Sequence, residues 1–130
     1  MKKILLALYL ATLAFLSLNP WLRPSGGDAF GEIAWDKVDH ALAYGGLTVL
    51  LIAALGKTLR GYWLPLAAIL VSAALGAFME YCQAWFTETR QFSVVDAYAN
   101  GVGAIFGALV FGLFQFVWRI IRPSCAEARP

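Results

Sequence analysis

Residues 80–107 read EYCQAWFTETRQFSVVDAYANGVGAIFG and join two long apolar runs through a short polar break. The apolar runs cover residues 64–86 and 94–121. Glu80 lies near the end of the first run, and Asp96 lies near the start of the second. A carboxylate inside an apolar segment costs free energy unless it has a partner or a function. The stretch therefore predicts two apolar helices that present polar groups at one shared end.

The composition of the whole chain indicates a membrane protein. Its 130 residues are 61% hydrophobic and 14% charged, whereas soluble proteins average about 45–50% apolar and about 25% charged residues. Several apolar runs approach the roughly 20 residues that cross a bilayer as a helix. The alternating pattern of a transmembrane barrel is absent, and no basic patch suits nucleic acid. The sequence therefore predicts an all-α, polytopic integral membrane protein without a nucleic-acid partner.

We predict a single transmembrane domain over residues 1–122, followed by a disordered tail over residues 123–130. Its four transmembrane helices are expected at about residues 4–21, 36–55, 64–86 and 94–121. The basic start and apolar run of the first helix also suit a signal peptide, but Ser17–Trp21 lacks a small-x-small cleavage site. A proline and a tryptophan at that point suit a membrane interface. We therefore expect the first helix to be retained.

The distribution of basic residues predicts the orientation of this domain. With a cytoplasmic N-terminus, the majority of them lie inside: Lys2, Lys3, Lys57, Arg60, Arg119, Arg122 and Arg129. Arg23, Lys37 and Arg90 lie outside. An excess of Lys and Arg marks the cytoplasmic side. We therefore expect a multi-pass protein of the bacterial inner (plasma) membrane, with both termini in the cytoplasm.

The same orientation brings polar residues of three helices to the outer leaflet. Asp36, His40 and Tyr44 share one face of the second helix at i, i+4 and i+8. The ligand-binding candidates at this end are Asp36, Lys37, His40, Tyr44, Glu80, Gln83, Arg90, Ser93, Asp96 and Asn100. Their convergence from separate helices predicts a polar pocket that opens outward.

These spaced residues also carry a family resemblance. The pattern is Asp36-Lys37-x-x-His40 with Tyr44, then Glu80-x-x-Gln83, Arg90, Ser93, Asp96, Asn100, Gly103 and Gly107. Over about residues 35–112 it resembles the VanZ-like family of small bacterial membrane proteins. That family is named for a protein of a glycopeptide-resistance cluster that is linked to teicoplanin resistance. The resemblance implies a cell-envelope protein with a link to antibiotic resistance, but it implies no particular reaction.

Binding of an anionic or amphiphilic ligand is the function that we expect. Lys37 and Arg90 would bind a phosphate, and arginine suits this role because its guanidinium binds two oxygens at once. The helix N-termini at this end add partial positive charge. The expected partner is a membrane lipid, a lipid-linked envelope intermediate or a glycopeptide-related ligand.

Three alternatives to ligand binding remain open. The first is a membrane enzyme for a lipid-linked substrate, with His40 as general base and either Asp96 or Glu80 orienting it; no motif of a known reaction class supports it. In the second, Asp36, His40, Glu80 and Asp96 supply oxygen and nitrogen ligands for a metal. The third is a purely structural network that fixes helix register. We predict no cofactor and no metal.

Small residues complete the pattern on the third and fourth helices. Gly76, Gly103 and Gly107 are expected to permit close helix packing. Gly103 and Gly107 could serve a contact within the chain or a homo-oligomer.

Overall fold

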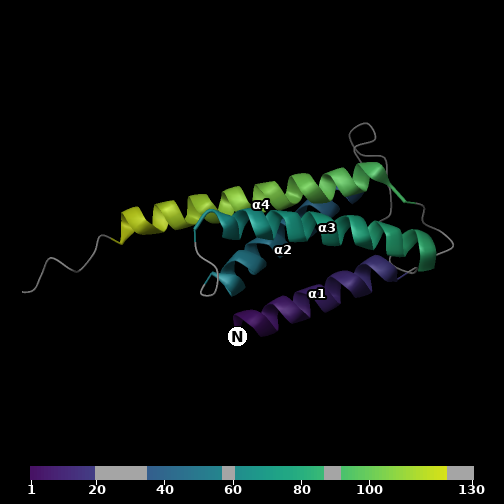
Figure 1. Cartoon of the computed structure of the whole chain (residues 1–130), viewed down its shortest axis with the longest axis horizontal. Coiled ribbons are helices and arrows are strands. Elements are labelled where there is room, and N and C mark those ends of the chain that lie inside the picture. Colours follow the sequence, from purple (N-terminus) through teal and green to yellow (C-terminus); the bar gives the residue numbers. More distant parts are fainter. Residues whose placement is uncertain (20–34, 57–60, 87–91, 123–130) are drawn as a thin grey trace, which may run out of the picture.

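The computed structural model describes residues 1–19, 35–56, 61–86 and 92–122. These residues form four helices, α1 (Lys2–Leu18), α2 (Trp35–Leu55), α3 (Trp63–Phe86) and α4 (Val94–Ile121) (Figure 1). No strand occurs within the described ranges, and the all-α class is confirmed. Arg90 and the tail over residues 123–130 lie outside the described residues.

Three of these helices, α2, α3 and α4, are long and apolar enough to cross a membrane. The first helix is shorter than we expected, with 17 residues that end at Leu18. Asn19 adopts an extended conformation with φ −81° and ψ 113°, because a residue before proline is disfavoured in the helical region. Pro20 and Trp21, which the predicted helix included, lie outside the described residues. A span by α1, and the side of the membrane on which each terminus lies, stay predictions.

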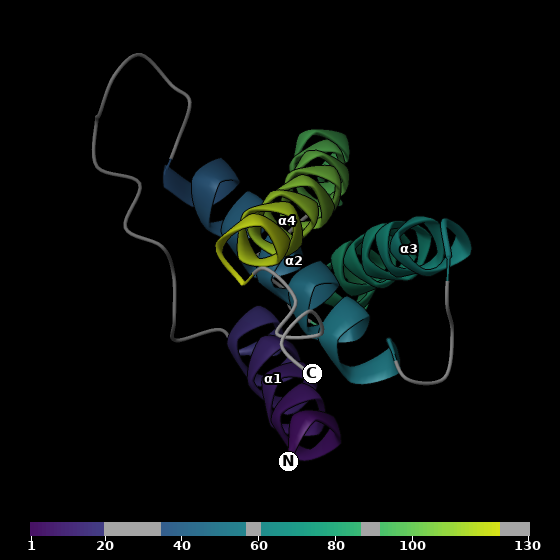
Figure 2. The ribbon, with the colours of Figure 1, turned by 90° about the vertical axis from the view of Figure 1, so that its left-hand side faces the viewer.

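Helix α2 is the central helix of the bundle and packs against α1, α3 and α4 (Figure 2). Its contact with α1 includes a hydrogen bond of 2.7 Å from the Tyr9 hydroxyl to the carbonyl oxygen of Ala43. The Tyr9 hydroxyl lies directly over Gly46, where a Cβ atom would approach it to 2.6 Å. Helix α1 therefore joins the bundle, although none of its residues is buried.

Helices α2 and α4 approach each other closely through glycines. A Cβ atom at Gly103 would collide with the backbone of Ala41, and one at Gly107 would collide with the backbone of Gly45. The expected small-residue seam on α4 therefore faces α2 of the same chain. A homo-oligomer built through Gly103 and Gly107 stays a prediction that this structure does not test.

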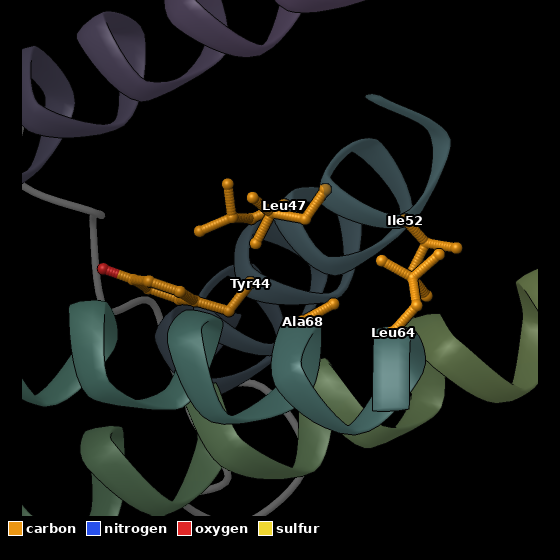
Figure 3. Close-up of a cluster of buried hydrophobic side chains, with 6 residues drawn as sticks. Tyr44, Leu47, Ile52, Leu64 and Ala68 are labelled. Atoms are coloured by element: carbon orange, nitrogen blue, oxygen red, sulfur yellow. The ribbon is translucent and has the colours of Figure 1, made fainter. Parts of the chain in front are cut away.

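The apolar core lies between α2 and α3, where Tyr44, Leu47, Ile52, Leu64 and Ala68 are buried (Figure 3). A buried hydrogen bond of 2.8 Å, from the Thr48 hydroxyl to the Ser72 hydroxyl, also joins the two helices. Most large apolar side chains of α4 are exposed, including Phe106, Leu109 and Leu113. Exposed apolar side chains of this kind suit a helix that has lipid as its solvent.

Candidate functional site

The start of α2, the end of α3 and the start of α4 meet at one end of the bundle (Figure 1). Most of the predicted site residues gather there and contact one another across the three helices. We call this group the polar cluster: Asp36, Lys37 and His40 from α2, Glu80 from α3, and Asp96 and Asn100 from α4.

Lys37 links the two aspartates of the polar cluster. Its Nζ atom lies 2.5 Å from Oδ1 of Asp96 and 3.3 Å from Oδ2 of Asp36. The side chains of Lys37 and Asp36 are each 27% exposed, whereas that of Asp96 is 12% exposed. Lys37 and Asp36 therefore form a rim that a ligand can reach.

His40 lies between all three helices. Its Nδ1 atom is 3.0 Å from Oδ1 of Asn100 and 3.6 Å from Oε1 of Glu80. Its Nε2 atom is 3.7 Å from Oδ1 of Asp36. With the proton on Nδ1, His40 donates a hydrogen bond to the amide oxygen of Asn100, which can only accept one. Nε2 then points its lone pair, or a second proton, towards Asp36.

Three polar side chains at this end of the bundle are almost fully buried. Asn100, Glu80 and Gln83 are at most 2% exposed. The absence of a side chain at Gly76 allows Asn100 to pack there, since a Cβ atom at Gly76 would lie 2.7 Å from Cβ of Asn100. Tyr44 is buried in the adjoining core, close enough to Glu80 for an electrostatic interaction.

The predicted site residue Ser93 contacts the polar cluster through the backbone of Asp96. Ser93 is the N-cap of α4, and its hydroxyl accepts a hydrogen bond of 3.2 Å from the backbone N–H of Asp96. This is the usual role of serine at a helix start. Arg90 lies outside the described residues. Of the two carboxylates considered as partners of His40, Glu80 lies beside Nδ1, whereas Asp96 contacts Lys37.

The charges of the polar cluster are unequal in the part of the chain that the structure describes. Three carboxylates, from Asp36, Glu80 and Asp96, face the ammonium of Lys37 and the imidazole of His40. Among the described residues, ligand atoms of Asp36, His40 and Asp96 all lie within 4.8 Å of one another. The cluster therefore combines a partly exposed lysine with three ligand atoms that can bind a cation.

Our sequence analysis did not predict the buried Thr48–Ser72 hydrogen bond. The signal was present, since Thr48 follows Tyr44 by four residues and so continues the polar face. It also overlooked Asp39, an exposed carboxylate next to His40 that lies outside the cluster.

A hollow of about 520 Å³ lies at the opposite end of the bundle. Helix α2 contributes its end, α3 its start, and α4 contributes Phe111, Gln115 and Arg119. It contains none of the predicted site residues, and its lining is mostly apolar. The polar cluster is therefore the candidate site.

Comparisons of the chain with protein-family models, with curated proteins and with solved structures found no match.

Proposed function

We propose that the chain is a multi-pass protein of the bacterial inner membrane that binds a phosphate-bearing amphiphile at the outer leaflet. The polar cluster is the proposed site. The observation that carries this proposal is the gathering of ionisable side chains from three apolar helices at one end, with a partly exposed rim. Ionisable residues within membrane-spanning segments generally mark a function.

The exposure of the rim favours binding over a purely structural network. Ion pairs that face water contribute little to stability, and the partly exposed contact of Lys37 with Asp36 stabilises the fold less than a buried pair would. The side chain of Lys37 is 27% exposed, and its ammonium can bind a phosphate oxygen. Helices α2 and α4 both begin at this end, and helix N-termini favour anions.

Anionic phospholipids and lipid-linked envelope intermediates share the chemistry that this site would recognise, namely a phosphate headgroup with a net negative charge at the membrane surface. The link to glycopeptide tolerance comes from the VanZ-like resemblance alone and is part of the proposal.

Native mass spectrometry of the protein, released gently from its own membrane in the presence of EDTA, tests the proposal. We expect the wild type to retain a phosphate-bearing lipid and Lys37→Gln to lose it. Arg119→Gln is the matched control, because it removes one positive charge at the opposite end. Equal retention by wild type and Lys37→Gln would contradict the proposal. The mass of the retained lipid separates a phospholipid from a lipid-linked intermediate.

The contacts of His40 favour an enzyme as the second candidate function. Its imidazole is held by Asn100 and flanked by carboxylates on both ring nitrogens, an arrangement that suits a general base. The same spectra test this candidate. Turnover would be supported if the wild type retained a lipid that differs in mass from the lipid retained by His40→Gln.

A further inference from the structure

Three side chains of the polar cluster offer a nitrogen and oxygen ligand set for a cation. One ligand atom from each of Asp36, His40 and Asp96 lies within 4.8 Å of the others. Zinc bonds histidine nitrogen and carboxylate oxygen at about 2.0–2.2 Å, which places neighbouring ligands of a tetrahedral ion about 3.4 Å apart. Nε2 of His40 and Oδ1 of Asp36 are already 3.7 Å apart. We infer that Asp36, His40 and Asp96 bind a divalent transition-metal ion, although the sequence led us to predict no metal.

The orientation of His40 is an independent observation for this site. Metal-binding histidines usually donate their second ring N–H to a carbonyl or carboxylate oxygen, which fixes the tautomer. Nδ1 of His40 lies 3.0 Å from the amide oxygen of Asn100, a side chain that is fully buried. This contact leaves Nε2 available on the side of Asp36. The buried amide therefore holds the imidazole in the orientation that a metal ligand requires.

The donor set determines the class of ion. Imidazole nitrogen favours zinc, copper, iron and nickel, whereas calcium, magnesium and manganese prefer oxygen ligands. A single histidine with two aspartates therefore selects the transition-metal class.

Lys37 acts as an internal competitor for this ion, since its ammonium lies between Asp36 and Asp96. The side chain is long and partly exposed, so it can turn outward when an ion binds. Metal binding would then have two effects on the rim. It would neutralise the two aspartates, and it would release Lys37 to face the ligand.

This consequence rests on the proposed function, because it would strengthen the binding of a phosphate that the cluster already holds without metal. The metal site itself does not rest on it and can be measured without lipid.

Zinc titration of the metal-stripped, detergent-solubilised full chain by calorimetry tests the inference. We expect a single zinc ion per wild-type chain. The zinc affinity should be at least about tenfold weaker in His40→Gln and Asp36→Asn, because even groups that only hydrogen-bond to metal ligands are worth about 10–100-fold in affinity. Asp39→Asn is the matched control, because it removes an exposed aspartate beside His40 that lies outside the ligand set; its affinity should not change.

Lys37→Gln should raise the zinc affinity, a result that misfolding cannot produce because misfolding would lower it. Removing the competing ammonium should tighten zinc binding by about tenfold, which corresponds to about 1.4 kcal/mol. His40 is the sole histidine in the chain, so its ¹⁵N resonances report on the site directly. Zinc should shift the Nε2 resonance far more than that of Nδ1.

Absence of zinc binding by the folded wild type would overturn the inference, and so would equal affinity in wild type, His40→Gln and Lys37→Gln. Lipid retention in EDTA is measured separately. Retained lipid without zinc binding would remove this inference alone, whereas zinc binding without any retained lipid would remove the proposed function alone.

Discussion

The close contact of α2 and α4 makes a strong prediction about two glycines of one helix. Gly103→Ala places a methyl group against the backbone of Ala41, whereas Gly101→Ala places one in open space, with no atom within 4 Å. Overpacking costs about 1–3 kcal/mol, and the collision here is with a helix backbone that cannot rotate away. Alanine in place of an exposed helical glycine gains about 0.5–1 kcal/mol. Both variants gain this helix-propensity term, so they should differ in unfolding free energy by the overpacking cost, about 1–3 kcal/mol.

Unfolding by SDS in mixed micelles, followed by circular dichroism, measures this difference. Gly103→Ala should unfold at lower SDS than the wild type, and Gly101→Ala at equal or higher SDS. The measurement is repeated at several protein concentrations, because a contact within one chain gives a midpoint independent of dilution. Equal stability of the two variants would refute the close contact of α2 and α4. If the SDS midpoint fell on dilution in the wild type but not in Gly103→Ala, Gly103 would instead belong to a homo-oligomer contact.

Two further predictions concern hydrogen bonds that fix the helices around the site. Thr48→Val should cost about 1–3 kcal/mol, because it leaves the buried Ser72 hydroxyl without its donor. Ser72→Ala should cost about 0.5–1.5 kcal/mol, because the Thr48 hydroxyl can still donate to the carbonyl oxygen of Tyr44. The double variant should cost less than the sum by about 0.5–3 kcal/mol in the same SDS assay, and strict additivity would argue against the bond. Ser93→Ala should cost about 0.5–2 kcal/mol through loss of the N-cap, and Ser93→Asp should restore that stability. If Ser93→Ala is as stable as the wild type, the cap is unimportant.

Helical periodicity is the reason that much of the site could be predicted from sequence. Residues four apart share a helix face, so Asp36 and His40 were expected together, as were Asp96 and Asn100. Both pairs lie in the polar cluster. Glu80 was expected there because a carboxylate within an apolar helix needs a partner, and it lies 3.6 Å from His40.

Contacts between helices could not be predicted in the same way, because they depend on how each helix is rotated and how closely two helices approach. The pairing of Lys37 with Asp96, rather than with Glu80, is set by the glycine contact of α2 with α4. The position of α1 follows from the hydrogen bond of Tyr9 to the backbone of Ala43, which carries no sequence signal. The end of α1 could have been predicted, since Asn19 precedes a proline.

The central claim is that the polar cluster binds an anionic headgroup, and thermodynamic linkage tests it most directly. A ligand that binds only the folded protein raises the unfolding free energy, by about 2.7 kcal/mol when its concentration is 100 times Kd. The measurement is SDS unfolding of the delipidated wild-type protein with added phosphatidic acid or with phosphatidylcholine of the same chains. Our account predicts a saturable increase in unfolding free energy with phosphatidic acid and a much smaller change with phosphatidylcholine. Equal effects of the two lipids, or no effect of either, would contradict it.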